Sequence, residues 1–308
     1  MAETLDALQL NLNDGGLMVM NISLCFIMFG VALELTIQDF RDLAKNPKST
    51  LTGVFSQFIF LPAATWLLVV LLEPTPSIAL GMMMVAACPG GNISNFFSQL
   101  SKGNSALSVS MTAIATTLAI IATPLNFTFW ASMYEPTNLI LREVSLDIWK
   151  VFEIVVLILG VPLIMGMVVR HFKPELAAKL TKWIKGFGVL FFAAFVIVAF
   201  SMNFDHFLNY VHLVVGLVFI HNAVALLGGY SLAAMMKLPF ADRKSIAIET
   251  GIQNSGLGLL LIFTFFDGLG GMALIAAWWG IWHILAGFTI GWYWSVGKKS
   301  LIKVFSNA

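Results

Sequence analysis

Charge is scarce in this sequence. Only 11% of its 308 residues are charged, whereas 59% are hydrophobic. An average soluble domain carries about 25% charged residues, and a soluble fold of this length needs more polar side chains to cover its surface. The mean hydropathy is +0.89. The composition therefore predicts an all-α integral membrane protein and disfavours a soluble domain.

Cysteine is scarce as well, and the net charge is close to zero. The two cysteines, Cys25 and Cys88, both lie inside apolar runs, so a disulfide framework is not expected. The formal net charge is only +1. Nucleic-acid binding depends on an excess of basic residues, so we expect no nucleic-acid partner. The first fifteen residues contain no basic segment, so we expect no cleavable signal peptide.

Nine segments are apolar and long enough to cross a bilayer, which takes about 20 residues. Helix-breaking residues such as Pro47, Pro136, Pro174 and Pro239 separate most of them. We therefore expect nine transmembrane helices, near residues 17–35, 51–72, 77–100, 105–133, 147–169, 186–204, 210–236, 244–267 and 272–296.

The basic residues test this count, because cytoplasmic loops carry an excess of Lys and Arg. With the N-terminus outside, only Arg142 and Lys150 of the 17 basic residues fall on the outer side. A missed or additional span would scramble every later loop. We therefore expect a multi-pass protein of the cell (inner or plasma) membrane, in contact with the lipid bilayer, with its N-terminus outside and its C-terminus in the cytoplasm.

Two of the nine spans are interrupted. The third contains CPGGNISN at 88–95, where Pro-Gly-Gly removes a backbone donor and loosens the helix. The eighth contains ETGIQNSG at 249–256, which places a carboxylate, an amide pair, a hydroxyl and two glycines at membrane depth. Either feature alone is ordinary in membrane helices. Together they occupy the middle of spans 2–4 and of spans 7–9, which run in opposite directions, and such a pair indicates the binding site of a secondary transporter.

Glu249 requires compensation at this depth. A carboxylate near the bilayer centre costs about 2.5–3.5 kcal/mol, and no basic residue lies inside a predicted span to pair with it. Glu249 is therefore either protonated or balanced by a cation. A hard cation prefers oxygen ligands, and the candidate oxygen donors are Gln57, Ser94, Asn95, Ser108, Thr112 and Gln253. Ser108 and Thr112 share one helix face, although such hydroxyls commonly bond their own helix.

The two interrupted motifs, with FGVALELTIQDF at 29–40 and the segment around Gln57, resemble the sodium/bile-acid symporter family over about residues 20–296. The resemblance implies a core domain of two inverted three-helix repeats with crossing broken helices, at 51–133 and 210–296. It also implies a panel domain at 17–35 and 147–204. A count of nine helices is similar to that of the vertebrate hepatic and ileal members of the family, whereas structurally known bacterial relatives have ten helices.

The same resemblance implies two sodium sites and a substrate site, with sodium as the coupling ligand and no other cofactor. The first sodium site would use Ser94, Asn95, Ser108, Thr112 and Glu249. The second would use Gln57, Glu249, Gln253 and the backbone carbonyls of Thr250 and Ile252. Asn92, Asn254 and His283 match positions that face substrate in bacterial relatives, although a lone histidine in an apolar helix can equally be a structural hydrogen-bonding residue.

We therefore expect a transporter, and no enzyme, that imports an organic anion with sodium by alternating access. The anion would be bile-acid-like or a smaller carboxylate. A proton-coupled transporter using Glu249 is the alternative. An intramembrane enzyme is disfavoured because the five histidines form no HxxHH or HExxH cluster and no Gly-x-Ser-x-Gly elbow occurs. A single charged site within inverted repeats argues against a channel.

Overall fold

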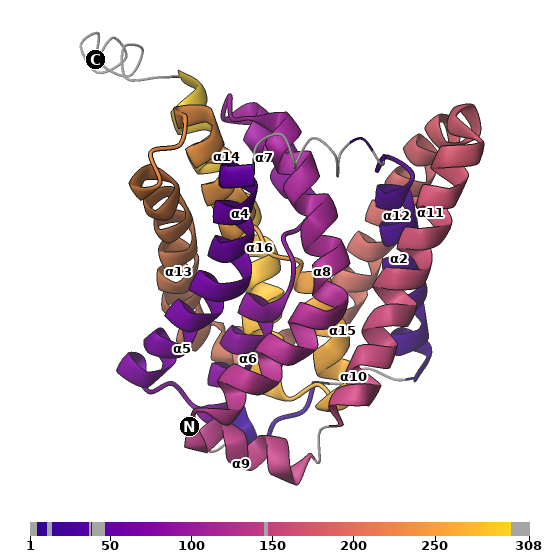
Figure 1. The fold of residues 1–308 in the computed structure, drawn as a ribbon. Helices are drawn as coiled ribbons and strands as arrows, with labels where there is room; N and C mark the ends of the chain where they lie inside the picture. The colour runs from indigo at the N-terminus through magenta and orange to yellow at the C-terminus, as the bar shows by residue number, and fades with distance from the viewer. Residues whose placement is uncertain (1–4, 11–13, 37, 39–46, 145–146, 297–308) are drawn as a thin grey trace, which may run out of the picture.

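The computed structural model describes residues 5–10, 14–36, 38, 47–144 and 147–296 (Figure 1). Within these ranges the regular structure is helical, with two isolated β-bridges, Gln9–Leu269 and Gly90–Gln253. Six helices of the described chain are long and apolar enough to cross a membrane. The prediction of an all-α integral membrane protein is confirmed at this level, and the number nine stays a prediction.

Each predicted span coincides with one helix or with consecutive helices. The short α9 (Glu135–Glu143) lies between the fourth and fifth of them. In chain order the others are α2 (Asp14–Ala32), α4 (Pro47–Phe55) with η1 (Ser56–Phe60) and α5 (Leu61–Leu72), α6 (Pro76–Ala87) with α7 (Ile93–Leu100), α8 (Ser105–Ser132), α10 (Ile148–Val155) with η2 (Val156–Gly160) and α11 (Val161–Phe172), α12 (Pro174–Met202), α13 (Phe204–Met235), α14 (Phe240–Gly251) with α15 (Ser255–Phe265), and α16 (Gly270–Val296).

Both π-helical turns, η1 and η2, precede a proline. Pro62 follows η1 and Pro162 follows η2, each at the second position of the next helix. Proline has no N–H to donate to the preceding turn, and a local widening of the helix accommodates this loss. In η1 the wide turn carries Ser56 and Gln57, and both side chains are buried.

The two broken helices meet at their interruptions. α6 ends at Ala87, and the next residue, Cys88, has extended backbone because it precedes Pro89. The Gly91 N–H donates to the Ile252 carbonyl at 2.7 Å, and the Asn254 N–H donates to the Pro89 carbonyl at 2.8 Å. Irregular backbone at membrane depth is tolerated only where protein or water satisfies it, and here each break satisfies part of the other.

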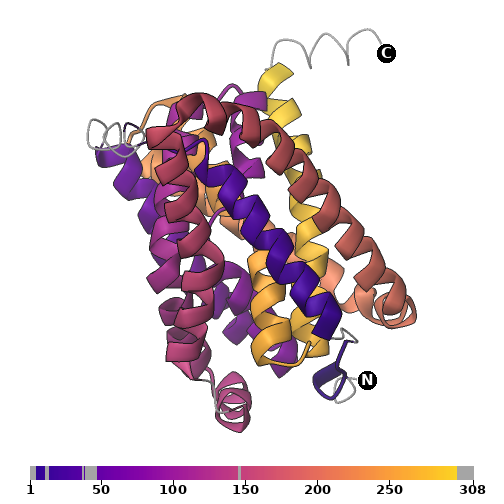
Figure 2. The ribbon, with the colours of Figure 1, turned by 90° about the vertical axis from the view of Figure 1, so that its right-hand side faces the viewer.

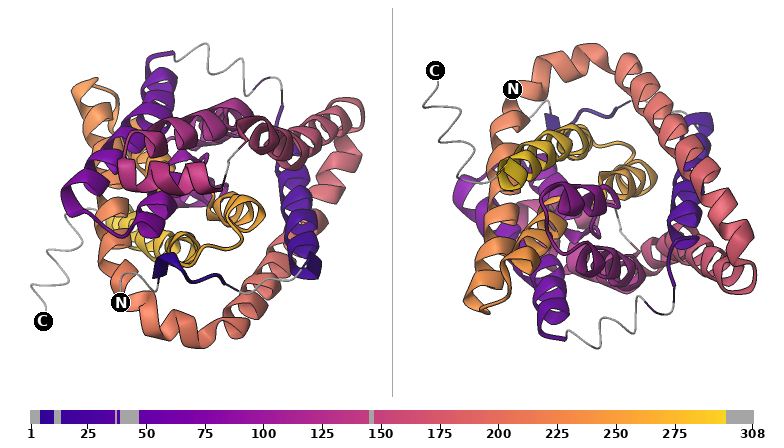
Figure 3. Two further views of the ribbon diagram at one scale, coloured as in Figure 1. Left: turned by 90° about the horizontal axis from the view of Figure 1, so that it is seen from below. Right: turned by 90° about the horizontal axis from the view of Figure 1, so that it is seen from above.

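Around this crossing the helices fall into two groups. α2 packs against α11 and α12 on the right of Figure 1, and Figure 2 shows α2 between them. Gly166 makes this packing close, since a Cβ there would lie 2.5 Å from the Ala32 Cβ. α6, α7, α8, α14, α15 and α16 surround the crossing, with α4, α5 and α13 at their side (Figures 1 and 3).

Arg142 of α9 and Lys150, at the start of α10, lie at the lower end of the bundle in Figure 1. The other described basic residues gather at the upper end, which we call the basic end. They stand at helix ends, where Lys102 Nζ donates to the Ser295 carbonyl at 2.9 Å and Lys244 Nζ donates to the Ser101 carbonyl at 2.7 Å. Arg41, Lys45, Lys298, Lys299, Lys303 and positions 37, 39 and 40 of the 29–40 motif lie outside the described residues. Orientation in the membrane stays a prediction.

Candidate functional site

The five residues predicted for the first sodium site lie together around the Glu249 carboxylate. Ser94 Oγ donates to Glu249 Oε2 at 2.5 Å, and Thr112 Oγ1 donates to Oε1 at 2.7 Å. Ser108 Oγ lies 3.2 Å from Oε2. Asn95 Oδ1 joins the group at 2.9 Å from Ser108 Oγ and 3.2 Å from Thr112 Oγ1. Three separate helices, α7, α8 and α14, therefore converge on one carboxylate.

This oxygen cluster is buried, and no basic side chain of the described chain is hydrogen-bonded to its carboxylate. Glu249, Ser94 and Ser108 are fully buried. Within the described chain, the contacts of the carboxylate are three hydroxyl groups, with no lysine or arginine among them. Thr112 Oγ1 also lies 3.1 Å from the Ser108 carbonyl of its own helix. The hydroxyl is therefore within reach of both its own backbone and the Glu249 carboxylate. Grouped neutral oxygens around a single carboxylate are what a hard cation prefers.

The residues predicted for the second sodium site lie beside the same carboxylate. A Cβ on Gly90 would lie 2.8 Å from both Gln57 Nε2 and Glu249 Oε1, so only glycine allows the break of α6 and α7 to pass here. Gln253 Nε2 donates to the Thr250 carbonyl at 2.8 Å. Gln253 Oε1 and Gln57 Nε2 are buried and find no hydrogen-bond partner in the described part of the chain, and an unpaired buried polar atom costs about 1–3 kcal/mol.

Three successive carbonyls at the end of α14 each accept a hydrogen bond from a different part of the chain. Those of Thr250 and Ile252 accept from Gln253 Nε2 and the Gly91 N–H. The carbonyl between them, that of Gly251, accepts from Asn222 Nδ2 of α13 at 2.7 Å. Carbonyls at a helix C-terminus lack partners within the helix, so these donors fix the directions in which the carbonyls point.

Ser56 and Asn222 also belong to this region, although the sequence motifs did not indicate them. Ser56 Oγ lies 2.8 Å from Thr250 Oγ1 and connects η1 to α14. The available signal for Asn222 was the polar pair His221-Asn222 within an apolar helix. His221 does not contact the crossing: its Nε2 lies 2.7 Å from Thr65 Oγ1, and its ring packs against Trp279.

Residues 21–210 match the model of the Sodium Bile acid symporter family, which is more than half of the chain. The chain belongs to this family. The family resemblance inferred from the interrupted motifs is thereby confirmed.

Several proteins are similar to this chain over most of its length. The uncharacterized sodium-dependent transporter YocS of Bacillus subtilis is 35% identical over 93% of this chain and 86% of its own length. The P3 protein of Mus musculus is 31% identical over 76% of this chain. The probable sodium/metabolite cotransporter BASS2, chloroplastic, of Oryza sativa is 29% identical over 78%. The matched region spans only 48% of the P3 protein and 55% of BASS2.

Of the three residues that the symporter resemblance assigns to substrate, Asn92 lines a cavity of about 320 Å³, which we call the polar cavity. This cavity lies between the end of α2 and the start of α7 and α8, and it reaches the oxygen cluster through Asn95 and Thr112. Asn92 Oδ1 is buried and has no hydrogen-bond partner among the residues that the structure describes. The polar cavity is lined by Val31, Glu34, Leu35, Asn92, Asn95, Phe96, Gln99, Ser105, Val109 and Thr112.

Asn254 and His283 do not line the polar cavity. Asn254 Oδ1 accepts from the Leu257 N–H at 3.1 Å and caps α15. His283 is buried in α16, and within the described ranges its Nδ1 has no hydrogen-bond partner. It lies between Gly280, which faces Ser255, and Gly287, which faces Phe97. His283 is therefore on the side of α16 that packs toward the crossing.

Asp242, at the basic end, connects the starts of three helices. Ser49 Oγ of α4 donates to Asp242 Oδ2 at 2.6 Å, and Asn104 Nδ2 donates to Oδ1 at 2.9 Å. Asn104 is also the cap of α8, because its Oδ1 accepts from the Leu107 N–H. Asp242 lies in the first turn of α14, the helix that carries Glu249. These bonds hold α4, α8 and α14 in register at one end of the site.

Proposed function

We propose that this chain is a secondary active transporter that moves sodium ions and an organic anion together across the membrane. The observation that carries the proposal is the buried cluster of Ser94, Asn95, Ser108 and Thr112 around Glu249, directly beside the crossing of two broken helices. Transporters with inverted repeats place coupling ions at such discontinuous helices. The family to which the chain belongs supports the same assignment.

Sodium suits this cluster for reasons of charge and ligand type. One bound monovalent cation would neutralise Glu249, which the described part of the chain leaves without a cationic partner. Binding requires only that the three hydroxyl hydrogens rotate away, so that the oxygen lone pairs face the ion. A second ion would use Gln253 Oε1, Gln57 and the carbonyls of Thr250 and Ile252. Occupation of both sites would hold the two breaks together.

The organic anion would bind in the polar cavity. The cavity reaches the start of α7 at Asn92, and the N-terminus of a helix favours negative charge. We assign α2, α10, α11 and α12 to a panel domain and the remaining long helices to a core domain. The cavity lies between panel and core, so movement of one against the other would expose it alternately. The substrate class is a bile-acid-like anion or a smaller carboxylate.

The test is the thermal midpoint of the purified chain in sodium against equal potassium. A ligand that binds only the folded state stabilises it by about 2.7 kcal/mol at a concentration of 100 Kd. We expect sodium to raise the midpoint of the native chain and of Ser98→Ala, and to have no effect on Glu249→Ala. Ser98 is the control because it is buried in α7, one turn after Ser94, and its hydroxyl has no hydrogen-bond partner in the described chain.

Two results would contradict the proposal. One is a native chain whose midpoint is the same in both salts. The other is Glu249→Ala that retains the full sodium effect, because sodium would then act elsewhere on the protein.

A further inference from the structure

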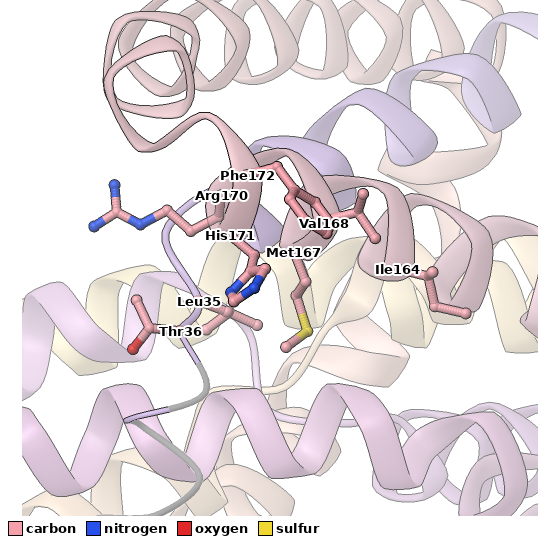
Figure 4. Close-up of a pocket in the computed structure, with 8 residues that line it drawn as sticks. All are labelled: Leu35, Thr36, Ile164, Met167, Val168, Arg170, His171 and Phe172. Carbon is pink, nitrogen blue, oxygen red and sulfur yellow. The ribbon is translucent and has the colours of Figure 1, made fainter.

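A second cavity, of about 500 Å³, lies between the end of α2 and the last turns of α11 (Figure 4). We call it the α2–α11 trough. It shares Leu35 with the polar cavity but contacts none of the proposed sodium ligands. Its lining residues are Leu35, Thr36, Ile164, Met167, Val168, Arg170, His171 and Phe172.

The trough exists because the two helices end at different heights. α2 and α11 are in close contact at Gly166, where an added Cβ would lie 2.9 Å from the Phe29 carbonyl oxygen. α2 then ends at Ala32, whereas α11 continues to Phe172. The upper part of α11 therefore loses its partner. Ile164 is 65% exposed and Phe172 is 72% exposed, so the described part of the protein leaves this wall open.

The wall is apolar along its length and basic at its end. Ile164, Val168 and Phe172 are four residues apart and form one ridge of α11. From Ile164 to Phe172 the ridge runs about 12 Å along the helix. At the basic end, Arg170 lines the mouth of the trough with its guanidinium group directed outward, and His171 points toward Leu35 (Figure 4). Within the described chain, no carboxylate pairs with Arg170, and Glu34 lines the polar cavity on the other side of Leu35.

We propose that the α2–α11 trough binds an anionic phospholipid, with its phosphate beside Arg170 and His171 and one acyl chain along Ile164, Val168 and Phe172. α11 belongs to a candidate membrane span that ends at Phe172, so Arg170 lies at headgroup level and Ile164 lies deeper, among acyl chains. Basic pockets between transmembrane helices are typical sites for anionic headgroups. A small soluble anion would leave the 12 Å wall (about eight residues of α11) unused, and a neutral lipid would leave Arg170 unused.

The experiment uses the full chain, stripped of lipid in detergent and kept in potassium without sodium, so its result does not depend on the proposed symport. Phosphatidylglycerol or phosphatidylcholine is added, retained lipid is counted by native mass spectrometry, and the thermal midpoint is measured. We expect retention and stabilisation by phosphatidylglycerol only. Arg170→Gln should weaken the apparent affinity about fivefold, from roughly 1 kcal/mol per basic residue near an anionic surface.

Two controls separate this site from general effects. Lys179→Gln removes one positive charge from α12, outside the trough, and should leave lipid retention and the thermal midpoint unchanged. Val168→Trp should fill the trough and prevent retention, whereas Val161→Trp, two turns deeper on the same helix and outside the trough, should not.

Three outcomes would overturn the proposal. Equal effects of the two lipids would show that the charge plays no part. Equal effects of Arg170→Gln and Lys179→Gln would show that the trough plays none. If phosphatidylglycerol has no effect in potassium, but stabilises the native chain and not Glu249→Ala when the measurement is repeated in sodium, the trough would belong to the transported anion instead of a lipid.

Discussion

Asn222 Nδ2 donates to the carbonyl oxygen of Gly251 at 2.7 Å, which connects α13 to the end of a broken helix 29 residues further along the chain. Both groups are buried. The carbonyls on either side of Gly251 are the two proposed as sodium ligands. Asn222 therefore holds the peptide units whose orientation the second sodium site depends on, without contacting the ion itself.

Removal of this bond should weaken sodium binding. In Asn222→Ala we expect the sodium concentration for half-maximal thermal stabilisation to rise about tenfold, which corresponds to roughly 1.4 kcal/mol of lost ligand orientation. Thr65→Val is the control, because it removes a buried hydrogen bond to His221, away from the crossing. The control should lower the midpoint equally in sodium and potassium. An unchanged half-maximal concentration in Asn222→Ala would restrict Asn222 to a structural role.

Thr112 is the most direct test of the first sodium site. Thr112→Val keeps the shape of the side chain but removes the oxygen that lies 2.7 Å from Glu249 Oε1. We expect the apparent affinity for sodium, measured from its thermal stabilisation, to fall at least tenfold, which corresponds to about 1.4 kcal/mol. Thr116→Val, one turn further along α8 and also buried, should behave as the native chain. Equal titrations for the two variants would argue against a sodium ligand at Thr112.

Gly90 should tolerate no side chain. A Cβ there would lie 2.8 Å from Gln57 Nε2 and from Glu249 Oε1, and overpacking costs typically 1–3 kcal/mol. We expect Gly90→Ala to lower the thermal midpoint in potassium and to abolish the sodium effect. Gly258→Ala is the matched control, because its nearest new contact is an ordinary 3.6 Å to Cys88 Sγ. A native-like sodium titration of Gly90→Ala would show that the crossing can relax.

The bond between Ser49 and Asp242 should contribute to stability and leave ion affinity unchanged. Ser49→Ala leaves one buried carboxylate oxygen without its hydroxyl donor, which costs about 1–3 kcal/mol. We expect a lower midpoint in both salts with the same sodium concentration for half-maximal effect. Thr52→Ala removes only a bond within α4 and should have a smaller effect. A shifted sodium titration in Ser49→Ala would make the basic end part of the ion site.

The sequence predicted the positions of the helices well. Membrane helices form their backbone hydrogen bonds internally, so a long apolar segment is sufficient to identify one. It also located both interruptions, since Pro89 is followed by two glycines, and Gly251 stands within a run of polar residues, and both clusters disfavour a continuous helix. The breaks themselves are local: α6 ends beside Cys88-Pro89, and α14 ends at Gly251. These features depend only on residues that are neighbours in the chain, so they can be predicted from one sequence.

Asn222 and Asp242 were missed for the opposite reason. A polar residue in an apolar helix can bond its own backbone, bond a distant helix or face water, and the sequence does not distinguish these cases. Asn222 reaches Gly251, and Asp242 reaches Ser49 across 193 residues. The sequence also did not fix the positions of Asn254 and His283 outside the polar cavity. Asn254 lies in the break that precedes α15, whose path depends on the crossing. His283 depends on the rotation of α16, which periodicity alone does not fix when all faces are apolar.

The sequence by itself determined that this chain is a helical membrane protein with two interrupted helices and one uncompensated carboxylate, because hydrophobicity, proline, glycine and charge act locally. Only the tertiary structure decided that Ser94, Ser108 and Thr112 direct their hydroxyls to that carboxylate, and that Asn222 holds the Gly251 carbonyl. Those contacts depend on how helices far apart in sequence pack and rotate against one another, and packing is a property of the whole fold.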